Sequence, residues 1–136
     1  MIDYKVNSLE IARYLISKAI PQGGIGIDAT AGRGRDTLFL AQQAGPEGKV
    51  WAFDVQEEAI EATRALLKEN NLSDRVNLVK AGHEHMALYV SFPVHAIMFN
   101  LGYLPGGDKK ITTQPDSTIH AVKAGLNLLG YSGIIT

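Results

Sequence analysis

Apolar positions along the chain fall into two alternating patterns, short continuous runs and stripes with helical spacing. The continuous runs predict buried strands at 25–29, 49–54, 76–81, 94–100 and 133–136. The stripes, with apolar residues three or four positions apart, predict helices at 8–19, 36–44, 57–70, 83–89 and 117–129. Because strand and helix alternate throughout, we expect an α/β fold with a mostly parallel sheet and helices on both faces.

The chain shows no internal repeat and no low-complexity linker, so we expect residues 1–136 to form a single domain. A long loop is predicted at 101–115, which contains three glycines and two prolines. The sequence stops within the expected fifth strand, whereas a sheet of this kind normally continues with a helix and an antiparallel pair of strands. We therefore expect a fold truncated after its fifth strand.

The first expected strand leads into a glycine-containing loop that is typical of a nucleotide site. Glycine lets the backbone approach a ligand closely, and the start of the next helix offers N–H groups. The third glycine of a dinucleotide loop is replaced by Thr37, and the acid Asp28 is unfavourable beside a pyrophosphate. S-adenosylmethionine (SAM), which has a sulfonium and no phosphate, fits better. The residues expected to line it here are Asp28, Thr30, Ala31, Gly32, Gly34, Asp36 and Thr37.

Two acids end neighbouring expected strands, and each has two interpretations. Asp54 lies 22 residues after Gly32, close to the spacing of an acid that binds ribose hydroxyls. We favour that role over capping of the next helix, and we place Val55 beside it in the cofactor site. Asp28 has two compatible roles, accepting a hydrogen bond from the ligand's amino group or from the N–H groups of its own loop.

Gly82 and His83 follow the third expected strand, where the adenine of such a ligand would lie. We expect His83 to hydrogen-bond or stack on the base, and the alternative is a partly exposed histidine without a ligand. The string from His83 to His85 also resembles a metal pair. However, no third ligand is identifiable and the spacing matches no common zinc pattern, so we expect no metal.

A second group of candidates follows the fourth expected strand. An amide, Asn100, ends an apolar run and precedes an aromatic residue in a flexible loop. Methyl transfer from a sulfonium requires a nucleophile aligned behind the methyl carbon, and an amide oxygen can aim an amine there. We expect Asn100 and Leu101 to contact the cofactor, Tyr103 to stack on a flipped base, and Asp108 to attract the amine or accept its proton. The alternative is a turn of purely structural importance, in which the Asn100 side chain caps the backbone and Tyr103 packs against the protein.

Composition limits the class of protein and its cellular compartment but does not decide the function. Apolar residues make up 46% of the chain, which is typical of a globular protein, and there is no cysteine for a disulfide. No apolar run approaches a membrane span, so we expect a cytoplasmic protein without a membrane partner. The net charge of −1 provides no overall attraction to nucleic acid. An RNA substrate would need a local basic patch, for which the candidates are Arg33, Arg35, Lys109 and Lys110.

These motifs identify a resemblance to a known family. Residues 28–41 and 98–109 resemble the first and fourth motifs of the YtqB/MnmM-type class I SAM-dependent methyltransferases, long labelled rRNA methylases. The resemblance implies a Rossmann-like three-layer sandwich and methylation of 5-aminomethyl-2-thiouridine at the tRNA wobble position. It also implies a tRNA anticodon partner and a homodimer. Two positions depart from the family pattern, because Arg33 and Arg35 stand where its glycine loop has Asn and His.

Three other functions stay open at this point. The first is methylation of rRNA with the same cofactor. The second is an NAD-binding oxidoreductase, which the threonine at position 37 disfavours. The third is a cofactor-binding fragment without activity, because the strands expected to follow residue 136 are those on which substrate binding would depend.

Overall fold

The computed structural model describes residues 8–91, 93–99 and 115–136. Its helices are α1 (Ser8–Ala19), α2 (Arg35–Ala44), α3 (Glu57–Glu69) and α4 (Pro115–Leu128), with short 3₁₀ helices η1 (Ser73–Arg75) and η2 (His83–Leu88). Its strands are β1 (Ile25–Asp28), β2 (Lys49–Asp54), β3 (Val76–Lys80), β4 (Val94–Met98) and β5 (Leu129–Ile135). The alternation that the apolar pattern predicts is therefore present.

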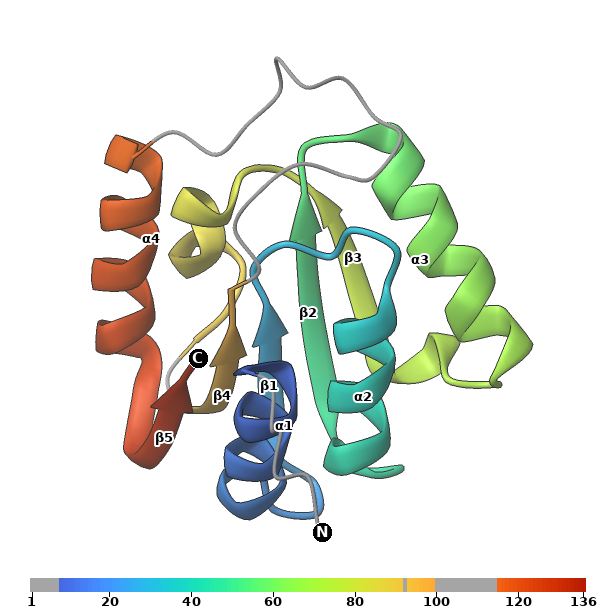
Figure 1. The fold of residues 1–136 in the computed structure, drawn as a ribbon, viewed down its shortest axis with the longest axis horizontal. Coiled ribbons are helices and arrows are strands. Elements are labelled where there is room, and N and C mark those ends of the chain that lie inside the picture. Colours follow the sequence, from blue (N-terminus) through green and yellow to red (C-terminus); the bar gives the residue numbers. More distant parts are fainter. Residues whose placement is uncertain (1–7, 92, 100–114) are drawn as a thin grey trace, which may run out of the picture.

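The strands form one sheet in the order β3-β2-β1-β4-β5, and all of their pairings are parallel (Figure 1). From β1 the chain first moves outward to β2 and β3, and then crosses to the other side of β1 to form β4 and β5. The order therefore reverses between β1 and β4. In parallel sheets, ligands bind beyond the carboxyl ends of the strands at such a reversal.

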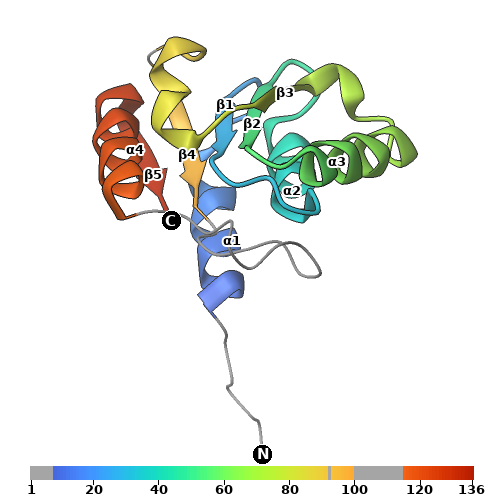
Figure 2. The ribbon, with the colours of Figure 1, turned by 90° about the horizontal axis from the view of Figure 1, so that it is seen from above.

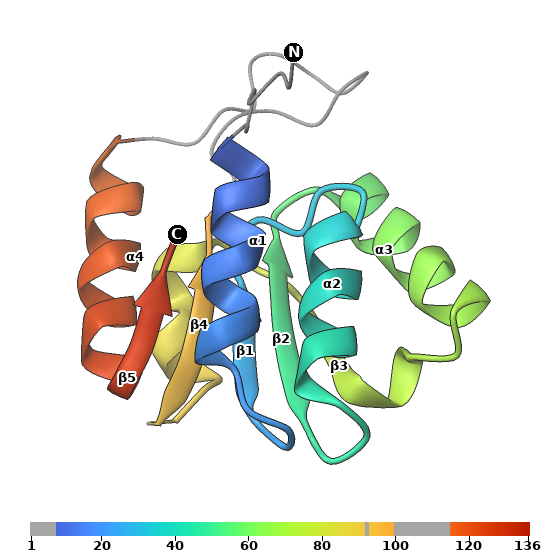
Figure 3. The same cartoon turned by 60° about the horizontal axis from the view of Figure 1, so that its bottom comes forward.

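Helices cover both faces of this sheet, which gives the expected three layers. Viewed from above, α1, α2 and α3 lie on one side, and α4 and η2 lie on the other (Figure 2). Helices α1 and α2 run side by side across the first face (Figure 3). Within the described residues, no helix is long and apolar enough to cross a membrane.

Each face of the sheet has its own apolar core. On the first face, Ile16 of α1 and Leu40 of α2 pack on Val50 of β2. On the second face, Ile97 of β4 packs with Met86 of η2 and Ala121 of α4. Strands buried on both sides explain why the sequence shows continuous apolar runs rather than alternation.

The fifth strand begins earlier than the expected 133–136. Leu129 directly after α4 already pairs with Val94, and the register then shifts before Ile134 pairs with Ala96. A side chain at Gly133 would lie 2.9 Å from the carbonyl oxygen of Val94, so this irregular stretch passes close to β4. Glycines weaken the pattern by which a regular strand is recognised, and a register shift leaves no mark in the sequence. The segment is extended because it pairs with β4.

Candidate functional site

Hydrogen bonds to its backbone hold the loop between β1 and α2 in place. Ala29 N–H donates to the Met98 carbonyl oxygen (2.8 Å) at the end of β4, and Ala31 N–H donates to that of Phe53 (2.8 Å) in β2. Gly34 N–H closes a turn onto the Ala31 carbonyl oxygen (2.8 Å). The loop is thus anchored to both strands that flank β1, at the edge where the fold predicts a ligand.

Asp28 lies beneath this loop and is fully buried. Its Oδ1 accepts the Thr30 N–H (3.1 Å), and its Oδ2 accepts the Thr37 hydroxyl (2.7 Å) from the first turns of α2. Burial raises the pKa of Asp28 from 3.8 to about 7; the negative charge of Asp36 adds to this rise, and the Thr37 hydrogen bond opposes it. Of the two roles expected for Asp28, holding the loop is the one that these bonds show, while contact with a ligand's amino group stays a prediction.

Asp54, at the end of β2, is only partly buried. Its Oδ2 accepts the Gly32 N–H (3.0 Å), and its Oδ1 accepts the Gln56 N–H (2.9 Å) just before α3. A carboxylate has about four acceptor positions, so two bonds leave capacity for hydroxyl groups. The structure therefore shows Asp54 bonded to the backbone of Gln56, the N-cap residue of α3, but, among the residues that it describes, no side-chain capping bond of that helix. The ribose role of Asp54 is compatible with this bond and stays a prediction.

The two glycines of the loop are needed for different reasons. Gly32 has a φ of +56°, a left-handed conformation that other residues rarely adopt, and a Cβ atom there would make only an ordinary contact with the Thr30 carbonyl oxygen (3.9 Å). Gly34 has a φ of +91°, and a Cβ atom there would lie 2.9 Å from the Cα of Thr63 in α3. Conformation alone thus favours glycine at position 32, whereas close packing of the loop on α3 also requires it at position 34.

The other expected cofactor residues lie at the ends of β2 and β3. Val55 follows Asp54 and is 54% exposed, so it offers an apolar surface at the carboxyl edge. Gly82 precedes η2, and His83 at the start of η2 is buried. The His83 ring meets Phe99 edge to face, with centroids 5.6 Å apart, and it hydrogen-bonds the backbone of Ala29. Burial lowers the pKa of His83, so its neutral form is favoured.

His83 is thus buried rather than partly exposed. His85 is exposed, and its Nε2 lies 3.5 Å from Oε1 of Glu84. The part of the chain that the structure describes holds no group of three or more residues suited to a metal ion. His95 has a structural contact, because its Nδ1 accepts the Ile25 N–H (3.0 Å).

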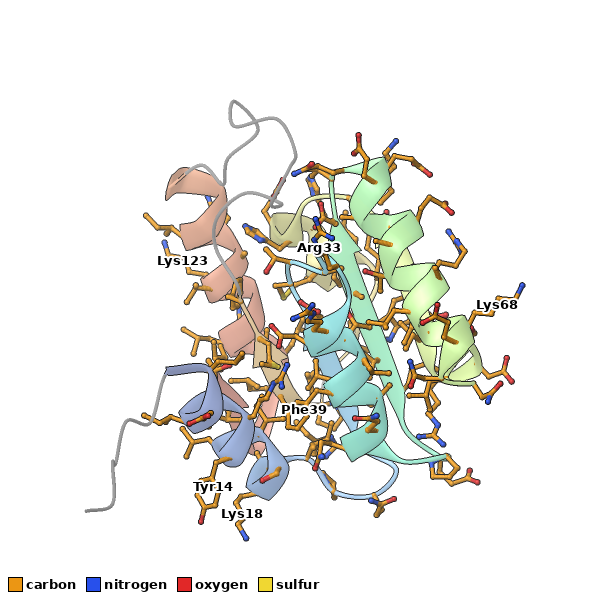
Figure 4. All side chains as sticks on the ribbon, turned by 45° about the vertical axis from the view of Figure 1, so that its right-hand side comes forward. Tyr14, Lys18, Arg33, Phe39, Lys68 and Lys123 are labelled. Atoms are coloured by element: carbon orange, nitrogen blue, oxygen red, sulfur yellow. The ribbon has the colours of Figure 1, made fainter. Side chains whose placement is uncertain are left out.

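Asp36 lies in the first turn of α2 and faces α1. Its Oδ1 is 3.4 Å from a guanidinium nitrogen of Arg13, whose guanidinium also sits over the Phe39 ring, 5.3 Å from its centroid. Phe39 lies on the side of α2 toward α1, whereas Arg33 projects from the glycine loop (Figure 4). Asp36 therefore ties α1 to the start of α2, and its expected role in the cofactor site stays a prediction.

The expected catalytic residues Asn100, Tyr103 and Asp108, and the cofactor residue Leu101, lie outside the described residues. The same holds for the candidate basic residues Lys109 and Lys110. Phe99, the last described residue before them, follows β4 and donates its N–H to the Thr136 carbonyl oxygen (2.9 Å) beside β5. Strand β4 therefore ends at the same edge as β1 and β2, and the roles of the residues after it stay predictions.

Comparison with known proteins places the chain in a family. Residues 50–136, more than half of the chain, match the family model described as "Putative rRNA methylase". The chain belongs to this family. A solved "putative rRNA-methylase" from Clostridium thermocellum is 45% identical, with a TM-score of 0.93 over 99% of this chain and 71% of that chain.

Two further relatives carry information about ligand and substrate. A "putative methyltransferase" from Streptococcus mutans, solved in complex with SAH, is 38% identical, with a TM-score of 0.87 over 99% of this chain and 72% of that chain. The Arabidopsis thaliana protein "tRNA (mnm(5)s(2)U34)-methyltransferase, chloroplastic" is 37% identical over 93% of this chain and 50% of its own length. The chain thus has the Rossmann-like class I methyltransferase fold and spans about half the length of this plant relative.

Sequence reasoning missed two residues that shape the site. Thr63 of α3 was visible only as one position on the buried side of a helix, yet its hydroxyl donates to the Gly32 carbonyl oxygen (3.2 Å). Arg13 of α1 gave no signal, although it pairs with Asp36. A threonine among apolar residues on the buried face of a helix was the one available hint, because such a hydroxyl needs a partner.

Proposed function

We propose that this chain forms the SAM-binding part of an RNA methyltransferase and that its glycine loop and Asp54 hold the methyl donor. The observation that carries this proposal is the arrangement at the ends of β1 and β2. There a partly buried carboxylate bonds a positive-φ glycine, beside the exposed Val55. Support comes from the S. mutans relative, which has this fold and was solved with SAH, the demethylated product of SAM.

In this proposal, described residues bind the ribose and the adenine of SAM. The remaining acceptor positions of Asp54 suit the two ribose hydroxyls. Val55 offers an apolar surface for the adenine. The edge-to-face pair of His83 and Phe99 lies just beyond the carboxyl ends of β3 and β4. The backbone of Gly32 can approach the ligand without a side chain in the way.

SAM supplies an activated methyl group, and the chain's task is to align a nucleophile with it. The lone pair of an amine nitrogen forms a bond to the methyl carbon while the electrons of the carbon–sulfur bond return to sulfur, which yields SAH. The resulting ammonium then releases a proton. In this proposal Asn100 aims the amine, Tyr103 stacks on the base, and Asp108 attracts the amine or accepts the proton.

We further propose that the substrate is the amine of a modified wobble uridine, 5-aminomethyl-2-thiouridine, in the anticodon region of tRNA. Support comes from the Arabidopsis relative, whose name gives this position, and from the loop residues 98–109 that resemble the same methyltransferases. A homodimer and a cytoplasmic location belong to this proposal. The family description favours rRNA as the second candidate substrate.

The first experiment is calorimetry of the folded protein with SAM, SAH and NAD. We expect binding of SAM and SAH, and no saturable binding of NAD. The dinucleotide is disfavoured because the Thr37 hydroxyl, at the third glycine position of a dinucleotide loop, is bonded to Asp28. Failure of the intact protein to bind SAM would remove the proposal, and tight binding of NAD would replace it with an oxidoreductase.

Transfer of a methyl group is tested separately with tRNA and rRNA from a strain that lacks the modification. We expect mass spectrometry of the nucleosides to show one added methyl group on the wobble uridine of tRNA. Methylation confined to rRNA would favour the second substrate. Binding of SAM without any transfer, with activity restored in a longer form of the protein, would identify the chain as a binding fragment only.

Asn100 separates alignment of the nucleophile from binding of the cofactor. We expect Asn100→Ala to lower kcat by roughly 100-fold, because misplacement of the reacting groups by about 1 Å can cost that much. The Kd for SAM should change much less. Single-turnover methylation and calorimetry on the same preparation measure the two effects, and unchanged turnover would remove Asn100 from the mechanism.

A further inference from the structure

Thr63, a buried residue in the middle of α3, directs its hydroxyl out of its own helix. A threonine at such a position often donates to the carbonyl oxygen four residues earlier in the helix. Here the described bond runs instead to the Gly32 carbonyl oxygen (3.2 Å), 31 residues away in the sequence. The side chain of Thr63 also lies against Gly34, where any added Cβ would meet it at 3.0 Å. One side chain thus contacts both glycines of the loop.

The backbone of Gly32 is consequently held from two sides. Asp54 accepts its N–H (3.0 Å), and Thr63 donates to its carbonyl oxygen (3.2 Å). A glycine has more backbone freedom than any other residue, and rotation of the peptide after it is the movement most available to this loop. The two hydrogen bonds restrict the backbone rotation of Gly32 before a ligand binds, so that the ligand does not have to order this residue.

The Thr63 bond also determines which way one peptide faces. The Gly32 carbonyl and the Arg33 N–H belong to the same planar trans peptide, in which the two groups point in opposite directions. Because the carbonyl is directed to α3, the N–H edge of this peptide is directed away from α3. Loss of the Thr63 hydroxyl would leave the Asp54 bond on one side only and allow the peptide to turn.

We propose that Thr63 is a positioning residue of the methyl-donor site, which holds the Gly32–Arg33 peptide in its binding orientation before SAM arrives. This inference rests on the proposed function only for the identity of the ligand. Pre-shaping a loop lowers the entropy lost on binding and therefore improves affinity without any new contact to the ligand. Thr63 acts through Gly32 and has no part in the chemical step.

The test compares Thr63→Val, which keeps the shape and loses the hydroxyl, with Thr63→Ser, which keeps the hydroxyl. Loss of one hydrogen bond predicts a Kd for SAM that rises about three- to tenfold in T63V. T63S should restore an affinity near that of the parent. In a methylation assay the KM for SAM should rise in T63V while kcat stays within about twofold. Glu61→Gln, on the exposed face of α3, is the matched control.

Hydrogen exchange of the ligand-free full chain tests the same clamp without SAM. We expect the Gly32 amide to exchange faster in T63V than in the parent and in T63S, by more than amides elsewhere in the chain. If the parent binds no SAM, the proposed function fails while this measurement still decides the role of Thr63. Should T63V not fold, Thr63→Ala takes its place.

Two results would overturn the inference. The first is equal SAM affinity and equal Gly32 exchange in the parent and the variant without the hydroxyl. The second is a loss of affinity in T63S with parent-like affinity in T63V, which would assign the effect to packing of the methyl group on Gly34 rather than to the hydroxyl.

Discussion

The ends of β1 and β2 carry the same side chain in nearly the same local geometry, yet they differ in burial. Asp28 accepts the N–H of the residue two positions later, Thr30, and Asp54 likewise accepts that of Gln56. The second oxygen of each reaches another segment, the Thr37 hydroxyl for Asp28 and the Gly32 N–H for Asp54. However, Asp28 is fully buried under the loop, whereas Asp54 is partly open at the edge.

This difference separates support of the loop from contact with the ligand. A carboxylate that is closed off from solvent and holds a proton up to a pH of about 7 is suited to holding backbone and hydroxyl groups in place. A carboxylate that keeps free acceptor positions at the edge is suited to binding hydroxyl groups of a ligand. Two aspartates that look equivalent in the sequence thus have surroundings that suit different roles.

The largest effect that we expect is a pH dependence of stability due to Asp28. Its pKa is 3.8 when unfolded and about 7 in the fold, so the folded state binds more protons between these values. The free energy of unfolding should therefore fall as the pH rises from about 4 to about 7, by an amount on the order of 4 kcal/mol, and level off above. Denaturant unfolding at several pH values measures this.

Asp28→Asn isolates this contribution from that of other acids. The Asn oxygen can accept the Thr30 N–H and its NH₂ can donate to the Thr37 oxygen, so both contacts survive without a titrating proton. We expect the stability of D28N relative to the parent to rise over the same pH range. An unfolding free energy of D28N that differs from that of the parent by the same amount at pH 4 and pH 7 would contradict a pKa of Asp28 raised by burial.

The second effect concerns SAM affinity at Asp54. Asp54→Ala removes the proposed ribose acceptor and the anchor of Gly32, and we expect a Kd for SAM about 10- to 100-fold higher, as for loss of charged hydrogen bonds. Asp54→Asn, which keeps one oxygen, should fall between D54A and the parent. The exposed acid Glu58 in the first turn of α3 provides the control E58A. Calorimetry showing equal affinity in D54A would refute the ribose role.

The smallest effect is expected at Thr37, whose hydroxyl donates to Asp28. Thr37→Val removes a hydrogen bond that holds the Asp28 pKa down, so that pKa should rise further and the loss of stability should move to higher pH. The cost in stability should be about 1 kcal/mol at neutral pH. Thr37→Ser should behave like the parent. A transition at the same pH in T37V would mean that the hydroxyl does not act on Asp28.

Much of the fold was accessible from the sequence, because periodicity is a local property. The strands 49–54 and 76–81 and the helices 8–19 and 57–70 agree with β2, β3, α1 and α3 to within a residue. The segment 83–89 was expected as a helix and forms the 3₁₀ helix η2 over His83–Leu88. The start of β5 could not be predicted, since its first residue is extended only through pairing with Val94.

The site was accessible to a smaller extent. A glycine loop after a strand and acids at strand ends can be recognised in the sequence, and both lie where they were expected. The contact between Thr63 and Gly32 joins residues 31 positions apart. No local pattern records such a pair, because it depends on how α3 packs against the loop.

The sequence by itself determined the alternation of strands and helices, the glycines at 32 and 34, and acids at the ends of β1 and β2, because each depends on neighbouring residues. Only the tertiary structure decided that Asp28 is buried and Asp54 open, and that α3 holds the loop through Thr63. The physical reason is that exposure and long-range hydrogen bonds depend on which elements pack together. That packing is settled by the whole chain rather than by any segment of it.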